Sequence, residues 1–298
     1  MYKKLLILAI NFFVILNVGI CHAEKVFEYG FEDWGGSVEA TPDYPFTSGY
    51  ASTMEEHYNC SEVVSSYDGM MPHSGNYMFL MNHSGSVALN PSVDGINSGS
   101  WNVENYVGLN ASYGGNNNFD IENSVNGECF VSFWTNLSNW QNQSEDHNTK
   151  LKLVRFYESN VDDVIFMIIV DYETKDPKIA ILAEGSYHYG PIVTSIGDGN
   201  WHKFSMYANY HTGQTAIWVD VENESLDNAT HSWKDSDGQL TGGPSPSPIK
   251  IMGNYSAHNP TGEQWHAIDD IEVWNSLPDE SDQTSDLTPP FEMTVTSN

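Results

Sequence analysis

Apolar and polar residues alternate with a two-residue period over 201–209, where Phe204 lies on one side and Trp201 on the other. A polar turn at 211–214 follows, and the alternation resumes over 215–221. A two-residue period is typical of a strand whose two faces meet different surroundings. The pattern predicts a β-hairpin with one buried face and one mixed face.

Further short segments read as strands. Residues 128–137 alternate, and 164–172 and 178–183 are almost continuously apolar, as expected of strands buried on both faces. Turn residues separate these segments, and no long helical pattern is present. The chain therefore predicts an all-β fold. The other expected strands are 27–32, 76–81, 86–90, 103–110, 150–157, 249–253 and 267–274.

Four short motifs resemble the laminin-G-like and concanavalin-A-like jelly-roll superfamily. They are VFEYGFEDWGG at 26–36, SGNYMFL at 74–80, the hairpin of GDGNWH and WVD within 197–220, and HAIDDIEVWN at 266–275. The resemblance spans 26–275 and implies a two-sheet antiparallel jelly-roll sandwich whose closing strand pairs beside the first. Lectins and enzymes share these motifs, so the resemblance indicates a fold and leaves the function open.

The resemblance also implies a structural calcium ion between the first and last strands. Its ligands would be Glu32, the carbonyl group of Gly75 and Asp270, and oxygen ligands of this kind suit Ca²⁺. The alternative is that Glu32 and Asp270 are ordinary surface acids in an acidic chain.

Composition divides the chain into three parts. Residues 1–23 read as a secretory signal peptide, with Lys3 and Lys4 before an apolar run. Residues 24–278 form the jelly-roll domain, and 279–298 an acidic flexible tail. We expect a secreted protein, extracellular or periplasmic, with no membrane contact after cleavage; an uncleaved membrane anchor is the alternative.

The charge of the chain restricts its partners. Beyond the signal peptide, 9 basic residues face 40 acidic ones, a formal charge of −31. Nucleic acid and anionic membranes need a basic surface, so we expect neither as a partner. The same argument disfavours polyanionic sugars and favours a neutral glycan. The acidity could also serve solubility alone, and the oligomeric state stays open.

Two cysteines remain after the signal peptide, Cys60 and Cys129. In an oxidising compartment they could form one disulfide. Two buried free thiols are the alternative, and the sequence does not decide between them.

A glycan-binding role needs aromatic platforms and polar partners for hydroxyl groups. We expect Trp201 and Trp218 in the core, whereas other aromatic side chains could line or rim one sheet. These ligand-binding candidates are Trp134, Trp140, Tyr157 and Tyr187, with Tyr189 beside them.

Catalysis on the same fold is the first alternative. A glycoside hydrolase needs two carboxylates, and Asp120 with Glu122 is the nearest pair. A polysaccharide lyase needs a group that neutralises a uronate and a base, for which Arg155, His188 and Tyr189 are candidates. A structural or adhesive surface module is the second alternative. The sequence thus favours a lectin-like binding protein and leaves enzymatic activity uncertain.

Overall fold

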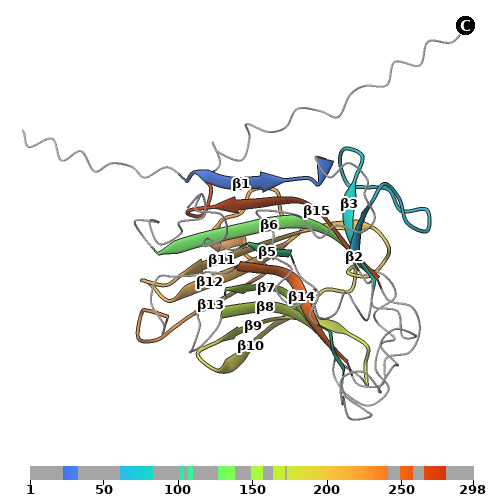
Figure 1. The fold of residues 1–298 in the computed structure, drawn as a ribbon. Helices are drawn as coiled ribbons and strands as arrows, with labels where there is room; N and C mark the ends of the chain where they lie inside the picture. Colours follow the sequence, from blue (N-terminus) through green and yellow to red (C-terminus); the bar gives the residue numbers. More distant parts are fainter. Residues whose placement is uncertain are drawn as a thin grey trace, which may run out of the picture.

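The chain folds into β-strands with one short 3₁₀ helix among the residues that the computed structural model describes (Figure 1). These residues are 23–32, 61–82, 101–103, 107–109, 127–137, 149–156, 164–171, 173–240, 249–257 and 265–279. In this part of the chain, no helix has the length and hydrophobicity that a membrane crossing requires. The predicted signal peptide and tail lie almost entirely outside these ranges.

The described strands form two sheets, and every strand pair is antiparallel. The first sheet runs β13-β12-β11-β6-β15-β3-β2, with β1 also on β15. The second runs β10-β9-β8-β7-β14-β4, with β5 also on β14. The bounds in the first sheet are β1 Lys25–Tyr29, β2 Ser61–Val64, β3 Met78–Asn82, β6 Glu128–Leu137, β11 Trp201–Asn209, β12 Gln214–Val219, β13 His231–Lys234 and β15 Trp265–Trp274. Those in the second are β4 Trp101–Val103, β5 Val107–Leu109, β7 Thr149–Phe156, β8 Val164–Val170, β9 Pro177–Ala183, β10 Ser186–Ile192 and β14 Ile249–Ala257.

This architecture confirms the predicted all-β jelly-roll sandwich of two antiparallel sheets. Figure 1 shows β1 and β15 side by side, although they come from opposite ends of the described chain, and the register pairs Tyr29 with Ile271. The closing strand therefore pairs with the opening strand, as expected.

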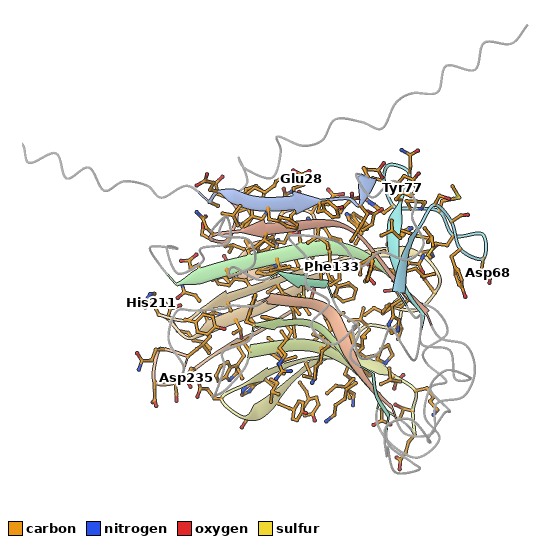
Figure 2. All side chains as sticks on the ribbon, viewed as in Figure 1. Glu28, Asp68, Tyr77, Phe133, His211 and Asp235 are labelled. Carbon is orange, nitrogen blue, oxygen red and sulfur yellow. The ribbon has the colours of Figure 1, made fainter. Side chains whose placement is uncertain are left out.

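The main core lies between the sheets. Phe133 of β6, which is labelled in Figure 2, Phe204 of β11 and Phe166 of β8 are fully buried there. Trp218 is also fully buried, but it belongs to a second cluster on the outer face of the first sheet, with Phe130 and Tyr207. Trp201 is half-buried in a further cluster beside β3. Trp218 is therefore buried as expected, although not between the sheets, and Trp201 is only half-buried.

Most predicted strands are found close to their expected bounds. The expected segment 103–110 is two short strands, and 86–90 lies outside the described residues. Three strands were not predicted, β2, β10 and β13. Strand β10 contains Gly190 and Pro191, which do not mark a strand in sequence, but an edge strand tolerates proline because one row of its amides is unpaired.

Cys129 is fully buried on β6, and this burial raises the pKa of its thiol well above the usual value. Cys60 lies outside the described residues. Both alternatives, a disulfide and two free thiols, therefore still stand.

Candidate functional site

Strand β7 presents three cationic side chains on the outer face of the second sheet. Strict alternation would place Lys150 and Lys152 on one face and Arg155 on the other. A bulge after Lys152 changes this, because Leu153 and Val154 both pack into the core. The extra residue restores Arg155 to the face of the two lysines, where all three side chains are half-buried.

The middle of this face is apolar. Ile165, Met167 and Ile169 of β8 and Ala180 of β9 are buried together, with Leu182 packed against them. The three β8 residues are in register with the three cationic residues of β7. These cations therefore lie along the β7 side of the apolar strip.

Two tyrosines lie on the opposite, β10 side of the strip. Tyr187 pairs with Leu182 and Tyr189 with Ala180, which puts both rings on the outer face. The rings stack with their centroids 5.9 Å apart and an interplanar angle of 19°. Their exposures of 38% and 59% make them the most accessible aromatic side chains among the described residues.

Lys150 connects the two sides of the face. Its Nζ donates a hydrogen bond to the Tyr187 hydroxyl over 2.9 Å and lies 4.7 Å from the centre of the Tyr187 ring. A fourth cation, Lys178 of β9, stands in register with Ile169, which in turn faces Lys150. We call this surface the tyrosine face; it comprises Lys150, Lys152, Arg155, Lys178, Tyr187 and Tyr189.

The structure does not bring the predicted aromatic platform together on one sheet. Tyr187 lies on the second sheet, whereas Trp134 lies on β6 and faces outward from the first sheet, where it stacks on the His73 ring at 3.8 Å. The expectation that these side chains line one sheet is therefore wrong for this pair, because β6 and β10 belong to different sheets. Trp140 and Tyr157 lie outside the described residues.

The lyase candidates are also separated. His188 alternates with Tyr187 and Tyr189, pairs with the core residue Ile181, and stacks on Trp233 at 4.0 Å. Of the three candidates, only Arg155 and Tyr189 share the tyrosine face. Asp120 and Glu122, the hydrolase pair, lie outside the described residues.

The predicted calcium ligands form a second candidate site, where β1 ends beside the segment 73–77. Glu32 accepts hydrogen bonds from the backbone N–H groups of Asn76 at 2.7 Å and Tyr77 at 3.1 Å, and from the Asn76 amide at 2.9 Å. Burial opposes ionisation of Glu32, but these hydrogen bonds outweigh it and lower the pKa of its carboxyl. The backbone of Gly75 runs directly against this carboxylate.

A bulge in β15 brings two further carboxylates to the same segment. Asp270 accepts hydrogen bonds from Ser74 Oγ and is 2.6 Å from His73 Nδ1. Asp269 is fully buried and accepts the N–H groups of His73 and Ser74. Burial, with the nearby charge of Asp270, raises the pKa of Asp269 to about 8, against the effect of the N–H donors.

These residues fit calcium only in part. Glu32, Gly75 and Asp270 do meet at one place, and no lysine or arginine forms an ion pair there among the described residues. The oxygens of Glu32, Asp269 and Asp270 already accept N–H or O–H groups, however. Within the described ranges, no three His, Cys, Asp or Glu side chains are placed to hold one metal ion. Backbone carbonyl groups would have to complete the coordination.

Sequence reasoning missed Asp269, His73 and Ser74 at this second site and Lys178 at the tyrosine face. The pair of adjacent acids at 269–270 was a visible signal, but the bulge that keeps Asp270 out of the core is not encoded in any local pattern. Lys178 could be placed only with the register of β9 against β8.

No family model matches the chain, and no curated protein matches it. Several solved structures are similar in fold. A putative β-glucanase from Mycobacterium abscessus matches with a TM-score of 0.45 and 10% identity, over 84% of this chain and 100% of that chain. A carbohydrate esterase from the Shiga toxin-encoding bacteriophage phi24B matches with a TM-score of 0.42 and 12% identity, over 85% and 99%. The binding domain of botulinum neurotoxin serotype D matches with a TM-score of 0.41 and 13% identity, over 87% of this chain and 49% of that chain. Likenesses at this level carry no functional argument, so function has to be argued from the residues of this chain.

Proposed function

We propose that this protein is a secreted, lectin-like glycan-binding protein of the concanavalin-A-like superfamily, and that the tyrosine face holds the sugar. The observation that carries the proposal is the exposed, stacked pair of Tyr187 and Tyr189 beside the Lys150 ammonium. The four motifs shared with the superfamily support the assignment of the fold, and the apolar run at 5–20 supports secretion.

The chemistry of the face suits a sugar. A sugar ring has an apolar C–H face that packs on an aromatic ring and hydroxyl groups that need hydrogen-bond partners. The tyrosine rings offer the first, and their hydroxyl groups with the lysine ammonium groups offer the second. Stacking of the two rings and the bond from Lys150 restrict Tyr187 before any ligand arrives, which lowers the entropy cost of binding.

The test is retention of the protein on immobilised polysaccharides, read together with two product assays. Unsaturated products would indicate a lyase, and new reducing ends would indicate a hydrolase. We expect retention without either product. The separation of His188 from Arg155 and Tyr189 supports binding over lyase chemistry by that set of residues.

We also propose that Glu32, Gly75 and Asp270 hold a structural calcium ion. The convergence of two carboxylates on one backbone turn supports this. The ion would supply positive charge that tethers the first and last strands to segment 73–77. It would take no part in sugar binding at the tyrosine face.

A further inference from the structure

Lys150 and Lys178 stand on either side of Ile169 on the tyrosine face. Lys150 pairs with Ile169 across β7 and β8, and Ile169 pairs with Lys178 across β8 and β9. Two strand spacings place the two backbones about 10 Å apart. Both side chains leave the same face, so they flank the apolar strip as a pair.

These two lysines are not neutralised by the described part of the chain. Lys150 has the Tyr187 phenol as its partner, and neither lysine forms an ion pair there. Asp171 lies near enough to Lys178 for the lysine to contribute to lowering its pKa, and this is a longer-range interaction than an ion pair.

Two lysines of the first sheet, Lys25 and Lys203, behave differently. Lys25 Nζ lies 3.0 Å from Glu272 and 3.2 Å from Glu28, and Lys203 Nζ lies 2.8 Å from the buried Glu224. A chain with 40 acidic residues supplies carboxylates readily. Within the described residues, Lys150 and Lys178 thus differ from Lys25 and Lys203 in lacking an ion pair.

Basic residues are also concentrated on the tyrosine face. Four of the nine basic residues beyond the signal peptide lie on the tyrosine face, namely Lys150, Lys152, Arg155 and Lys178. The net charge of −31 disfavours polyanions at long range, but salt screens such repulsion beyond about 8–10 Å. A ligand seated on the face experiences the local cations first.

Resting on the proposed glycan-binding function, we infer that the ligand of the tyrosine face is an acidic polysaccharide, with Lys150 and Lys178 pairing its carboxylate or sulfate groups. This replaces the neutral glycan that net charge alone indicates. The tyrosine rings would hold the uncharged sugar faces between acidic groups. A nucleic acid fits less well, because its dense phosphates would extend over the acidic remainder of the surface.

The test compares matched polymers that differ only in charge. Binding of the full chain to polygalacturonate would be measured beside binding to the same polymer after its carboxyl groups are reduced to alcohols. Chondroitin sulfate and its desulfated, carboxyl-reduced form make a second pair. We expect the acidic member of at least one pair to bind at least tenfold more tightly, with the preference falling as salt rises.

The variants Lys150→Gln and Lys178→Gln should each lower that preference severalfold. Lys234→Gln, an exposed lysine on β13 away from this face, is the matched control and should keep it. Equal or tighter binding of the neutral members would overturn the proposal that the ligand is acidic, but it would leave the proposed glycan binding intact. Retention of no polymer at all would overturn both proposals. Single-stranded DNA is a further comparison. If it bound as tightly as the acidic sugars and through the same lysines, the proposal that the face recognises a sugar would be overturned.

Discussion

The Lys150 ammonium donates a 2.9 Å hydrogen bond to the Tyr187 hydroxyl, although strands β8 and β9 separate the two residues. The bond spans the apolar strip of the tyrosine face and joins its cationic side to its aromatic side. Tyr187 is thereby held by both Lys150 and the ring of Tyr189, which is itself the more exposed of the two. The face thus has one fixed ring and one accessible ring.

Substitutions of Tyr187 separate the ring from its hydroxyl group. Tyr187→Ala removes the aromatic surface and should weaken glycan affinity about tenfold, or about 1.4 kcal/mol. Tyr187→Phe keeps the ring and loses the hydroxyl group with its bond from Lys150, so its affinity should fall only a few-fold. Isothermal titration with the retained polysaccharide measures both. A phenylalanine variant as weak as the alanine variant would show that the ring contributes nothing.

His202 should make stability depend on pH. Its Nδ1 lies 2.8 Å from Asp220 and its Nε2 lies 3.1 Å from Asp198. Burial alone would lower the pKa of His202, but the hydrogen bonds to the two carboxylates outweigh it and raise the pKa. A raised pKa in the folded state stabilises the fold below the unfolded value of about 6.5, and this stability is lost as pH rises through the folded pKa.

The variant His202→Gln should therefore cost more at acidic than at alkaline pH. We expect a loss of about 2 kcal/mol in the free energy of unfolding well below pH 6.5, because hydrogen bonds to charged groups are worth about this much. Urea denaturation of both proteins across the pH range measures the difference. His211→Gln, in the exposed turn of the hairpin, is the control. An equal loss at all pH values would contradict a charged His202.

Gly75 should be more sensitive to substitution than Gly69, although both have a positive φ. Its φ is +58°, and a Cβ atom would meet the Glu32 carboxylate. Gly69 has a φ of +84° with open space around it. Gly69→Ala should therefore show only a backbone cost of about 1 kcal/mol. Gly75→Ala should lose at least about 1 kcal/mol more, because it also displaces Glu32 from its N–H donors. Equal losses in thermal or urea unfolding would show that Glu32 can move freely.

Calcium should raise the thermal stability of the protein if Glu32, Gly75 and Asp270 bind it. A ligand at 100 times its dissociation constant stabilises the folded state by about 2.7 kcal/mol. We expect the midpoint of thermal unfolding to rise with calcium, to fall with a chelator, and to respond far less in Asp270→Asn. The control is Asp68→Asn, on the loop between β2 and β3 that Figure 2 labels. A midpoint independent of calcium would contradict calcium binding by Glu32, Gly75 and Asp270.

The strands that could be predicted from the sequence are those with a clear local pattern of apolar and polar residues. The hairpin of β11 and β12 and the long strand β6 have unlike faces, so their alternation marks their bounds closely. Strand β10 was given no bounds because Gly190 and Pro191 are acceptable only at a sheet edge, and edge position is a property of the whole fold. The same limit separates Trp134 from Tyr187, since the order of strands in the sheets is set by long-range pairing.

The composition of the two sites was harder to predict than their positions. Glu32, Gly75 and Asp270 were selected as candidate calcium ligands from motifs that resemble those of a known family. Arg155 joins Lys150 and Lys152 only because of the bulge at Leu153. Asp270 is kept out of the core only because of the bulge in β15, which leaves Ile268 and Ile271 both in the core. Both bulges invert the face that strict alternation assigns.

The most direct test of the tyrosine face is the affinity of Tyr189→Ala for the polysaccharide that retains the wild-type protein. Tyr189 is 59% exposed, so its removal should leave the fold intact. Met71→Ala removes a side chain of similar exposure, 62%, on the loop between β2 and β3 and serves as the matched control. We predict that Tyr189→Ala loses about tenfold or more in affinity while Met71→Ala binds like the wild type. Unchanged affinity of Tyr189→Ala, with its unfolding midpoint also unchanged, would contradict the claim that this face binds the sugar.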